Sequence, residues 1–497
     1  MKTPVAIAPS ANEAMRENSK TQFLRQSRDP RILRYGNGGG WRNSLLLPVI
    51  LFLCFPIACQ NQTQTSMVNF AHLEHLTEQI TMAGDTVDIV HVYANYPDYR
   101  WVDAKESGPE GIACVDDAAR AAVVYVRDFE LHHRQASLDH ARRLLRFVLA
   151  MQDSDGQFYN FIHEDHAINR DGKTSFKSFG WWAARGVWSL GHGYRVFKNI
   201  DSAFARRLRS AMERSIPHVS ALLRKYGQRD EDAGFVFPRW LLHESAADAT
   251  SELLLGLVEY WRAEPSDSLR DAIRRLADGL TVMQNGDIGT FPFGLHRSWR
   301  TQWHLWGNSQ TQVLAMAGKV LGDSAMISSA RREADGFYTR LLSEGLFKEM
   351  DLRSPDVRTE FEQIAYGIRP MAVGLIRLYE ATGNADYVRL AGVSASWLFG
   401  NNAAGTAMYD PATGRCYDGI QSSTGINRNS GAESTIEALG TLVELEAYPE
   451  ALAYAQCKRV DGSVTPSYSK GTFELPGGKR FILHIDAQQR RFWFEEK

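Results

Sequence analysis

Two short polar motifs near the two ends of the chain carry carboxylates at the start of apolar stretches. Residues 111–120 read GIACVDDAAR, and residues 425–435 read GINRNSGAEST. Apolar residues follow both motifs at helical spacing, so the carboxylates belong to the first turns of two helices. Two carboxyl groups that face each other across a cleft can cleave a glycosidic bond, because one protonates the leaving oxygen while the other activates water. We therefore interpret the two motifs as halves of one candidate catalytic site.

The first motif offers two aspartates and an arginine. Asp116 and Asp117 would point about a third of a turn apart, so one can cap the helix while the other faces a cleft. Arg120 follows them by four and three positions and can pair with either carboxylate. Such a pair would keep the aspartate ionised, as a base that activates water must be. We favour Asp117 as the base, with Asp116 as the alternative.

Glu433 of the second motif is the partner candidate. A glutamate in the first turn of a helix can serve the helix alone, by complementing its dipole or closing a capping box. Its polar neighbours Asn427, Asn429 and Ser434 favour a different role, because they can orient a carboxyl group and hydrogen-bond sugar hydroxyls. Both interpretations of Glu433 stay open at the level of sequence.

Aromatic residues near helix ends are candidate sugar platforms, since the C–H faces of sugars are apolar. Residues 296–306 (HRSWRTQWHLW) interleave aromatic and basic side chains just before a predicted helix. This segment is the best subsite candidate, with His296, Trp299 and Trp303 as the contacting residues. Trp182, at another predicted helix start, is a further candidate.

The apolar spacing of the chain is helical almost throughout. It predicts helices over 116–133, 137–152, 179–197, 202–226, 246–263, 267–284, 308–321, 326–345, 360–382, 385–399, 431–445 and 448–457. They fall into about six hairpins whose connections alternate between short and long. We therefore predict an all-α fold, an (α/α)6 toroid over residues 95–457, with the long loops building a cleft. Alternating segments after residue 457 predict a small β appendage over 458–497.

The composition is that of an ordinary globular protein. The 497 residues are 44% hydrophobic and 23% charged, with a formal net charge of -2. No basic stretch is dense enough to track phosphates, so we expect no nucleic-acid partner. Residues 163–166 (HEDH) lack a third spaced ligand, and we expect a solvated loop there, with no metal and no other cofactor. Cys114 and Cys416 lie beside the two motifs, and we expect two buried free thiols.

The N-terminus resembles an export signal. Residues 1–43 are polar with five arginines after residue 24, and residues 44–59 (SLLLPVILFLCFPIAC) form a short apolar core. Residues 56–59 resemble a lipobox, in which Cys59 would be lipidated and become the mature first residue. We expect an exported periplasmic or cell-surface lipoprotein that meets the membrane only through this anchor, with residues 60–94 as a tether leading into the toroid. A plain cleaved signal and an uncleaved short anchor are the alternatives.

The chain resembles the helical-toroid domain found C-terminal to a glycosyltransferase in some bacterial proteins. The resemblance rests on residues 116–120 (DDAAR), 184–191 (ARGVWSLG) and 425–435, and it covers most of residues 95–455. More distantly the chain is similar to six-hairpin glycosidases, including family 9 glycoside hydrolases, which pair early aspartates with a late glutamate. The resemblance implies an enzyme acting on carbohydrate, and we expect an inverting glycoside hydrolase on an oligo- or polysaccharide.

Two alternatives to hydrolysis stay open. Helical-toroid polysaccharide lyases use a tyrosine or histidine base and neutralise a uronate with asparagine, histidine or arginine. Tyr366 and Arg369, with His243 and Asn308, offer these residue types, although they are scattered along the sequence. The second alternative is a catalytically inactive toroid that binds glycans.

Overall fold

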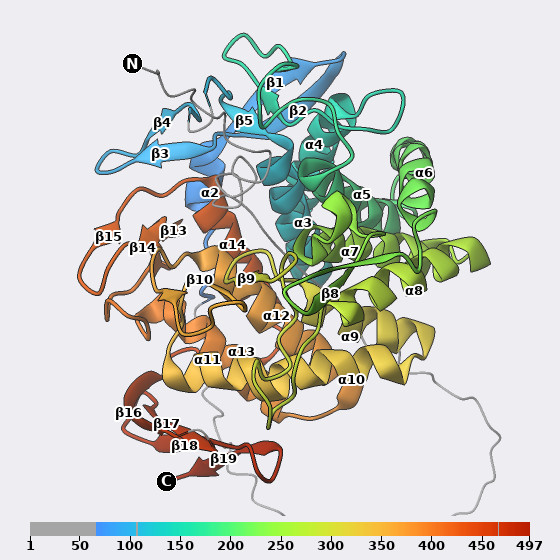
Figure 1. The fold of residues 1–497 in the computed structure, drawn as a ribbon. Helices are drawn as coiled ribbons and strands as arrows, with labels where there is room; N and C mark the ends of the chain where they lie inside the picture. The colour runs from blue at the N-terminus through green and yellow to red at the C-terminus, as the bar shows by residue number, and fades with distance from the viewer. Residues whose placement is uncertain (1–65, 106–107, 466) are drawn as a thin grey trace, which may run out of the picture.

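Six helices form the closed inner ring of a toroid in the computed structural model, which describes residues 66–105, 108–465 and 467–497. Each inner helix contacts the next, and the last contacts the first, so the ring closes (Figure 1). The inner helices are α3 (Val115–His132), α5 (Trp181–Phe197), α7 (Ala247–Ala263), α9 (Gln310–Leu321), α12 (Ala365–Thr382) and α14 (Ala432–Leu445).

Each inner helix is followed, after a short turn, by an outer helix that runs back along it. The outer helices are α4 (Gln135–Met151), α6 (Ser202–Leu223), α8 (Asp267–Val282), α10 (Ser324–Glu333), α13 (Asp386–Ala395) and α15 (Pro449–Tyr454). A π-type turn (Ala334–Tyr338) continues α10 into α11 (Thr339–Glu344), and a 3-10 turn (Ser396–Phe399) continues α13. The prediction of a six-hairpin (α/α)6 toroid is confirmed.

Local sequence signals place the helix ends. Asp201, Ser266 and Asp323 accept backbone N–H bonds at the starts of α6, α8 and α10. Gly322 and Gly383 adopt the left-handed conformation that ends α9 and α12. The helix predicted over 360–382 begins only at residue 365, because the backbone of Gln363 instead exchanges two hydrogen bonds with Ile420.

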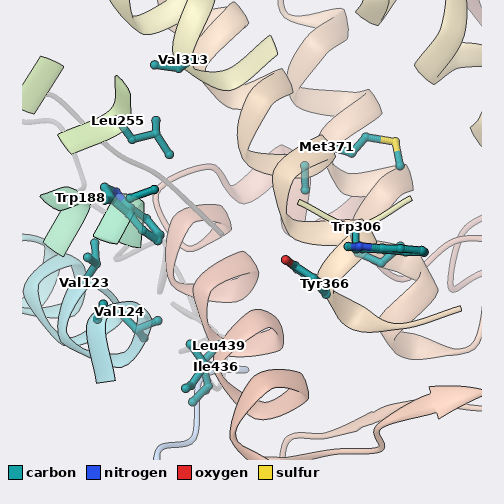
Figure 2. Close-up of a cluster of buried hydrophobic side chains, with 14 of the residues drawn as sticks. Val123, Val124, Trp188, Leu255, Trp306, Val313, Tyr366, Met371, Ile436 and Leu439 are labelled. Carbon is teal, nitrogen blue, oxygen red and sulfur yellow. The ribbon is translucent and has the colours of Figure 1, made fainter. Parts of the chain in front are cut away.

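The interior between the helices is apolar over most of its depth. Figure 2 shows side chains from all six inner helices in this core, among them Val123, Trp188, Leu255, Val313 and Met371. The helices α5 and α7 approach most closely where two glycines, Gly191 and Gly256, face each other. A Cβ atom at either position would overlap the backbone of the other helix.

The long connections enter the inner helices from one side of the ring and carry short strands. These are β5 (Ala113–Cys114), β6 (Phe161–Ile162), β7 (Arg229–Asp232), β8 (Phe235–Pro238), β9 (Gln302–His304), β10 (Glu349–Asp351), β11 (Arg358–Thr359), β12 (Tyr409–Asp410), β13 (Arg415–Cys416), β14 (Gly419–Ile420) and β15 (Ile426–Asn427). Every strand pairing in the described chain is antiparallel.

The segment before the toroid is folded rather than extended. Its elements are α2 (Ala71–Leu76), β1 (Thr77–Met82), β2 (Asp85–Val90), β3 (Tyr93–Asn95) and β4 (Arg100–Val102). The carbonyl oxygens of Val92 and Ala94 accept bonds from the N–H groups of Ala432 and Ser430, just before α14. Within the predicted tether and entry segment, 60–94, residues 66–94 are thus a folded entry that packs against the closing hairpin.

The C-terminal appendage is a four-stranded antiparallel sheet in sequence order. Its strands are β16 (Lys458–Val464), β17 (Tyr468–Glu474), β18 (Arg480–Asp486) and β19 (Arg491–Glu496). Phe473, Phe481 and Leu483 bury one face against the toroid, where β17 contacts α11 (Figure 1). Within the described residues, no helix is long and apolar enough to cross a membrane.

Candidate active site

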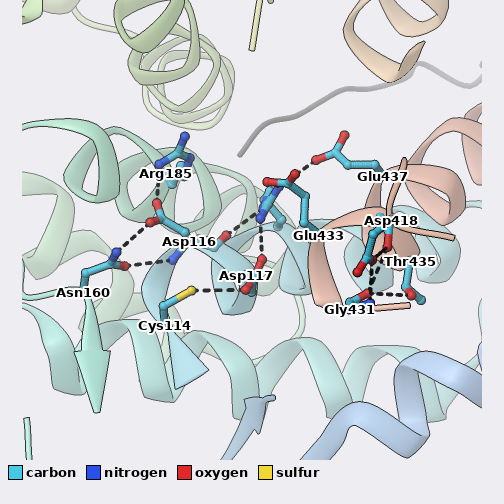
Figure 3. A network of polar contacts seen from close by, with 12 residues as sticks. Cys114, Asp116, Asp117, Asn160, Arg185, Asp418, Gly431, Glu433, Thr435 and Glu437 are labelled. Atoms are coloured by element: carbon cyan, nitrogen blue, oxygen red, sulfur yellow. Dashed lines mark hydrogen bonds and ion pairs between the residues drawn. The ribbon is translucent and has the colours of Figure 1, made fainter. Parts of the chain in front are cut away.

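Eight charged side chains from five inner helices meet within the first two turns of the ring, and we call them the central cluster. They are Asp116, Asp117, Arg120, Arg185, Glu252, Arg369, Glu433 and Glu437. Figure 3 shows how α3 and α14 contribute most of them. Seven of the eight are at most 1% exposed, whereas the Glu433 side chain is 17% exposed. Glu433 is therefore the member that a ligand can reach most directly.

Arg120 joins the two sequence motifs. Its Nη2 contacts Asp117, and its Nη1 lies 2.9 Å from Glu437 Oε1 and 3.4 Å from Glu433 Oε2. Arg120 and Glu433 are 313 positions apart in the sequence. The expectation that ring closure brings the two motifs to one face is thus confirmed.

Neither aspartate caps α3. The N-cap position is occupied by Cys114, which makes no side-chain cap, and both aspartates lie within the first turn. Asp116 instead pairs with Arg185 and accepts a 2.8 Å hydrogen bond from Asn160 Nδ2. The capping role considered for one aspartate is wrong, because both carboxylates have side-chain partners inside the ring.

Three members of the cluster were not among the residues selected from the sequence: Arg185, Glu252 and Glu437. Glu437 Oε2 lies 3.1 Å from Arg369 Nε, and the Arg369 guanidinium also donates to Gln312 at 3.1 Å. Glu252 lies 3.5 Å from Arg185 Nε. Glu437 could have been found, because it lies four positions after Glu433 and thus on the same helix face.

Charge balance requires some of these carboxyl groups to hold protons. The cluster contains three guanidinium groups and five carboxyl groups, so full ionisation would leave two excess negative charges away from water. Burial raises the pKa of Glu433 and of Glu252 well above the usual range, against the pull of the nearby arginines. Burial also raises the pKa of Glu437 to about 8. Burial therefore favours the neutral form in Glu433, Glu252 and Glu437.

Asp117 differs from the expectation in one respect. It does pair with Arg120, and its Oδ2 accepts a 3.2 Å bond from the Cys114 thiol. Burial nevertheless raises the pKa of Asp117, and the attraction of Arg120 offsets this rise only in part. The expected pair with Arg120 is thus present, but burial, which the sequence did not reveal, opposes the ionised form of Asp117.

Most of the predicted sugar platforms are core residues. Trp303 packs against Phe337 and Phe347, with ring centroids 4.8 and 5.0 Å away. The indole of Trp182 is buried and donates to the Phe158 carbonyl oxygen at 2.7 Å. Because these rings have no free face, the substrate-binding roles predicted for Trp182 and Trp303 are not supported by their placement.

His296 and Trp299 have different surroundings. His296 is fully buried, with Nδ1 2.8 Å from Glu333 and Nε2 3.0 Å from Ser329, so both ring nitrogens are occupied within the fold. Trp299 is half-buried, and the guanidinium of Arg300 lies 4.7 Å from its ring centroid. Of the four predicted platform residues, only Trp299 keeps an accessible edge.

Asn427 and Asn429 lie in the loop that leads to Glu433, as predicted. Their amide oxygens hold this loop: Asn427 Oδ1 accepts from the Asn429 N–H at 3.2 Å, and Asn429 Oδ1 accepts from the Tyr96 N–H at 3.0 Å. Tyr96 is half-exposed on the β3–β4 hairpin, with the Arg428 guanidinium 6.0 Å from its ring. This aromatic residue was not singled out from the sequence, because it lies in a short hairpin and not near a predicted helix end.

Three residues of the lyase alternative are already engaged within the fold. Tyr366 lies beneath the Arg120 guanidinium, 5.8 Å from its ring, and burial raises the pKa of this phenol well above its usual range. Arg369 is bound to Glu437 and Gln312, while Asn308 bonds to Ser298 and His304. A phenol that resists ionisation is a poor base, so the arrangement disfavours a lyase.

The other features noted in the sequence are the cysteines, residues 163–166 and the predicted signal. Cys114 and Cys416 are buried free thiols and do not pair with each other. In the described parts of the chain, no three metal-ligating side chains converge, and residues 163–166 form a surface loop. Cys59 and the whole predicted signal, residues 1–59, lie outside the described residues.

Comparisons with solved structures place the fold among sugar-enzyme toroids. Cellobiose 2-epimerase from Bacillus thermoamylovorans B4167 matches with a TM-score of 0.54 and 12% identity, over 76% of this chain and 96% of that chain. A D-mannose isomerase matches at 0.50 and 11% identity, over 72% and 91% of the two chains. A family 9 endoglucanase, J30, matches at 0.46 and 15% identity, over 72% and 75%. No family model and no curated protein sequence matches the chain. At these identities the two matches with TM-scores of 0.54 and 0.50 establish the toroid fold alone.

Proposed function

We propose that the chain is a carbohydrate-active enzyme that hydrolyses a glycosidic bond at the central cluster. Glu433 is the general acid that protonates the leaving oxygen, and Asp117 is the base that takes a proton from the attacking water. The observation that carries this proposal is the state of Glu433, which combines a raised pKa with a partly exposed side chain. A carboxyl group that holds its proton to a higher pH than usual and can be reached from outside is suited to donate it.

The surroundings of Asp117 are the second support for this assignment, in which Glu433 is the acid and Asp117 is the base. Arg120 stands between Asp117 and Glu433 and contacts both, so the two carboxyl groups are separated rather than in direct contact. Inversion requires room for a sugar and a water molecule between the two carboxyl groups, so the Arg120 guanidinium would have to move aside when substrate binds. Arg120 also favours the charged form of Asp117 that a base requires. The proposed stereochemical outcome is therefore inversion.

A second candidate reaction is isomerisation or epimerisation of a sugar. It is favoured by fold matches with TM-scores of at least 0.50, among them an epimerase and an isomerase. Glu433 would then protonate a carbonyl oxygen of an open-chain sugar rather than a leaving group. The two candidates share the proton donor and differ in the product, so one assay can separate them.

The test uses the purified full chain with a panel of oligosaccharides that includes cellobiose, and with mannose. New reducing ends are measured chemically, and the product anomer and any epimer are identified by NMR. For a hydrolase, Glu433→Gln and Asp117→Asn should each lower kcat by roughly 10² or more while substrate affinity changes little, because shape is kept and proton transfer is lost.

Matched controls are available on the surface of the toroid. Glu450 and Asp267 also lie in the first turns of helices, α15 and α8, but their side chains are 42% and 90% exposed. Glu450→Gln and Asp267→Asn should leave turnover unchanged. Undiminished hydrolysis in Glu433→Gln and Asp117→Asn would refute the assignment. An epimer formed without new reducing ends would establish the second candidate, and glycan binding without any product would identify a binding module.

A further inference from the structure

A cavity lies away from the central cluster, where the toroid meets the C-terminal sheet. Its volume is about 480 Å³, within the range of small-molecule sites. The wall is formed by α11, by α13 with its 3-10 continuation, by residues 400–405 and by the start of β16. Its apolar side includes Leu341, Leu346 and Trp397. This lining offers a ring-sized surface on which the C–H face of a sugar can pack.

The cavity also holds a buried polar group without a partner. Ser394 is 1% exposed and lines the cavity, and its Oγ makes no hydrogen bond within the described structure. Burying a hydroxyl without a partner costs free energy, and such groups in folded proteins call for an explanation. A ligand hydroxyl or carboxylate in the cavity would supply the missing partner.

Two cations border the same cavity. Lys458 and Arg459 begin β16, and among the described residues no carboxylate lies within ion-pair distance of either. The Lys458 ammonium donates to the Phe399 carbonyl oxygen, which fixes its position at the rim and leaves its charge uncompensated. The Arg459 N–H is held by Asn401 Oδ1 at 2.9 Å, so the strand that carries both cations is anchored to the cavity wall.

We propose that this cavity binds an anionic monosaccharide, one that carries a carboxylate or a phosphate. The apolar wall accommodates the sugar ring, Ser394 bonds to a ring substituent, and Lys458 with Arg459 neutralises the anion. The apolar wall argues against a bare anion, because such an ion would not pack against Leu341, Leu346 and Trp397. The two cations argue against a neutral sugar, because such a sugar would give neither of them an anionic partner. The site is separate from the proposed catalytic cluster and does not depend on its function.

Isothermal titration calorimetry on the full chain tests this proposal with four probes: glucuronate, glucose 6-phosphate, glucose and inorganic phosphate. We expect at least one of the two anionic sugars to bind, with glucose and phosphate at least about tenfold weaker. The stronger anionic sugar identifies the anion as carboxylate or phosphate. Arg459→Gln and Ser394→Ala should each weaken its binding by about tenfold or more.

Further variants separate this role from simple structural effects. Ser394→Ala should not lower Tm without ligand, because it removes a hydroxyl that has no partner in the described structure. Lys479→Gln, which removes a sheet lysine paired with Glu496, should leave binding unchanged, and so should Glu433→Gln. The proposal fails if neither anionic sugar binds, if phosphate alone binds as tightly, or if binding survives Arg459→Gln and Ser394→Ala. It also fails if Glu433→Gln abolishes binding, since the ligand would then occupy the central cluster.

Discussion

At the scale of single residues, the protonation of Glu252 in the central cluster makes the stability of the fold depend on pH. It is fully buried, and burial raises its pKa well above the ordinary value of 4.5. The folded state therefore binds a proton that the unfolded state releases, so the free energy of unfolding falls as the pH rises above about 4.5. We predict that Glu252→Gln, which stays neutral, will make unfolding less dependent on pH above about 4.5, as measured by urea denaturation.

The matched control is Glu213→Gln, since Glu213 is exposed on α6 and paired only with Arg209. This change should leave the pH dependence of stability as it is in the parent chain. A parent protein whose stability rises with pH in that window, or a Glu252→Gln variant with the same slope as the parent, would contradict the assignment of a buried neutral carboxyl group.

At the scale of helices, the approach of α5 and α7 depends on two glycines. A Cβ at Gly256 would overlap the Val187 carbonyl oxygen and the backbone of Trp188, which cannot move independently of α5. We predict that Gly256→Ala lowers the free energy of unfolding by about 1–3 kcal/mol, the usual range for overpacking. Chemical denaturation monitored by circular dichroism measures this change.

Gly374→Ala on α12 is the control for helix propensity. There the nearest atom to an added Cβ is the Thr311 Cγ2 at 3.2 Å, a side-chain methyl group that can shift slightly. Alanine also favours a helix over glycine by up to about 1 kcal/mol, so this variant should be close to neutral. Equal losses in the two variants would mean that close helix contact is not what Gly256 provides.

At the scale of the whole molecule, a second buried layer of charges helps to close the ring. Glu444 on α14 accepts from Arg127 of α3 at 2.7 Å and from Arg377 of α12 at 2.6 Å, and all three are at most 1% exposed. Arg127 and Glu444 each follow a central-cluster residue, Arg120 and Glu437, by two helical turns. The first and last hairpins are thus tied at two levels of the ring.

We predict that Glu444→Gln destabilises the protein by up to about 3–5 kcal/mol, because two buried arginines lose their fully buried anionic partner and keep only Glu130 and Glu380 near the surface. Thermal unfolding should show a single transition at lower temperature, whereas the exposed-pair variant Arg209→Gln should change stability by less than about 1 kcal/mol. A loss below about 1 kcal/mol for Glu444→Gln would show that ring closure rests on apolar packing alone.

The location of the whole molecule is a further prediction, which rests on sequence alone. If Cys59 is lipidated, the protein expressed in a bacterium should partition with membranes, and Cys59→Ser should release it. Fractionation followed by immunoblotting measures this, with Cys54→Ser as the control within the same apolar segment. Membrane association that persists in Cys59→Ser would indicate an uncleaved anchor instead.

The sequence by itself determined the elements and their order. Helical spacing, capping residues such as Asp201 and Ser266, and turn glycines such as Gly383 act within a few positions, so six hairpins and the β appendage could be predicted with small boundary errors. The motifs that hold Asp117 and Glu433 could also be recognised, because first-turn carboxylates followed by an apolar helix form a local pattern.

Only the tertiary structure decided which charged side chains form ion pairs and which side chains are buried away from water. Arg120 reaches Glu433 and Glu437 because the ring closes, and nothing near Arg120 in the sequence encodes that contact across 313 positions. Trp303 shows the same dependence in an aromatic residue: its loop looks like a surface platform, yet Phe337 and Phe347 cover the ring. The burial of a side chain and its ion pairs depend on neighbours that are distant in the sequence. They therefore follow from the assembled ring and not from local spacing.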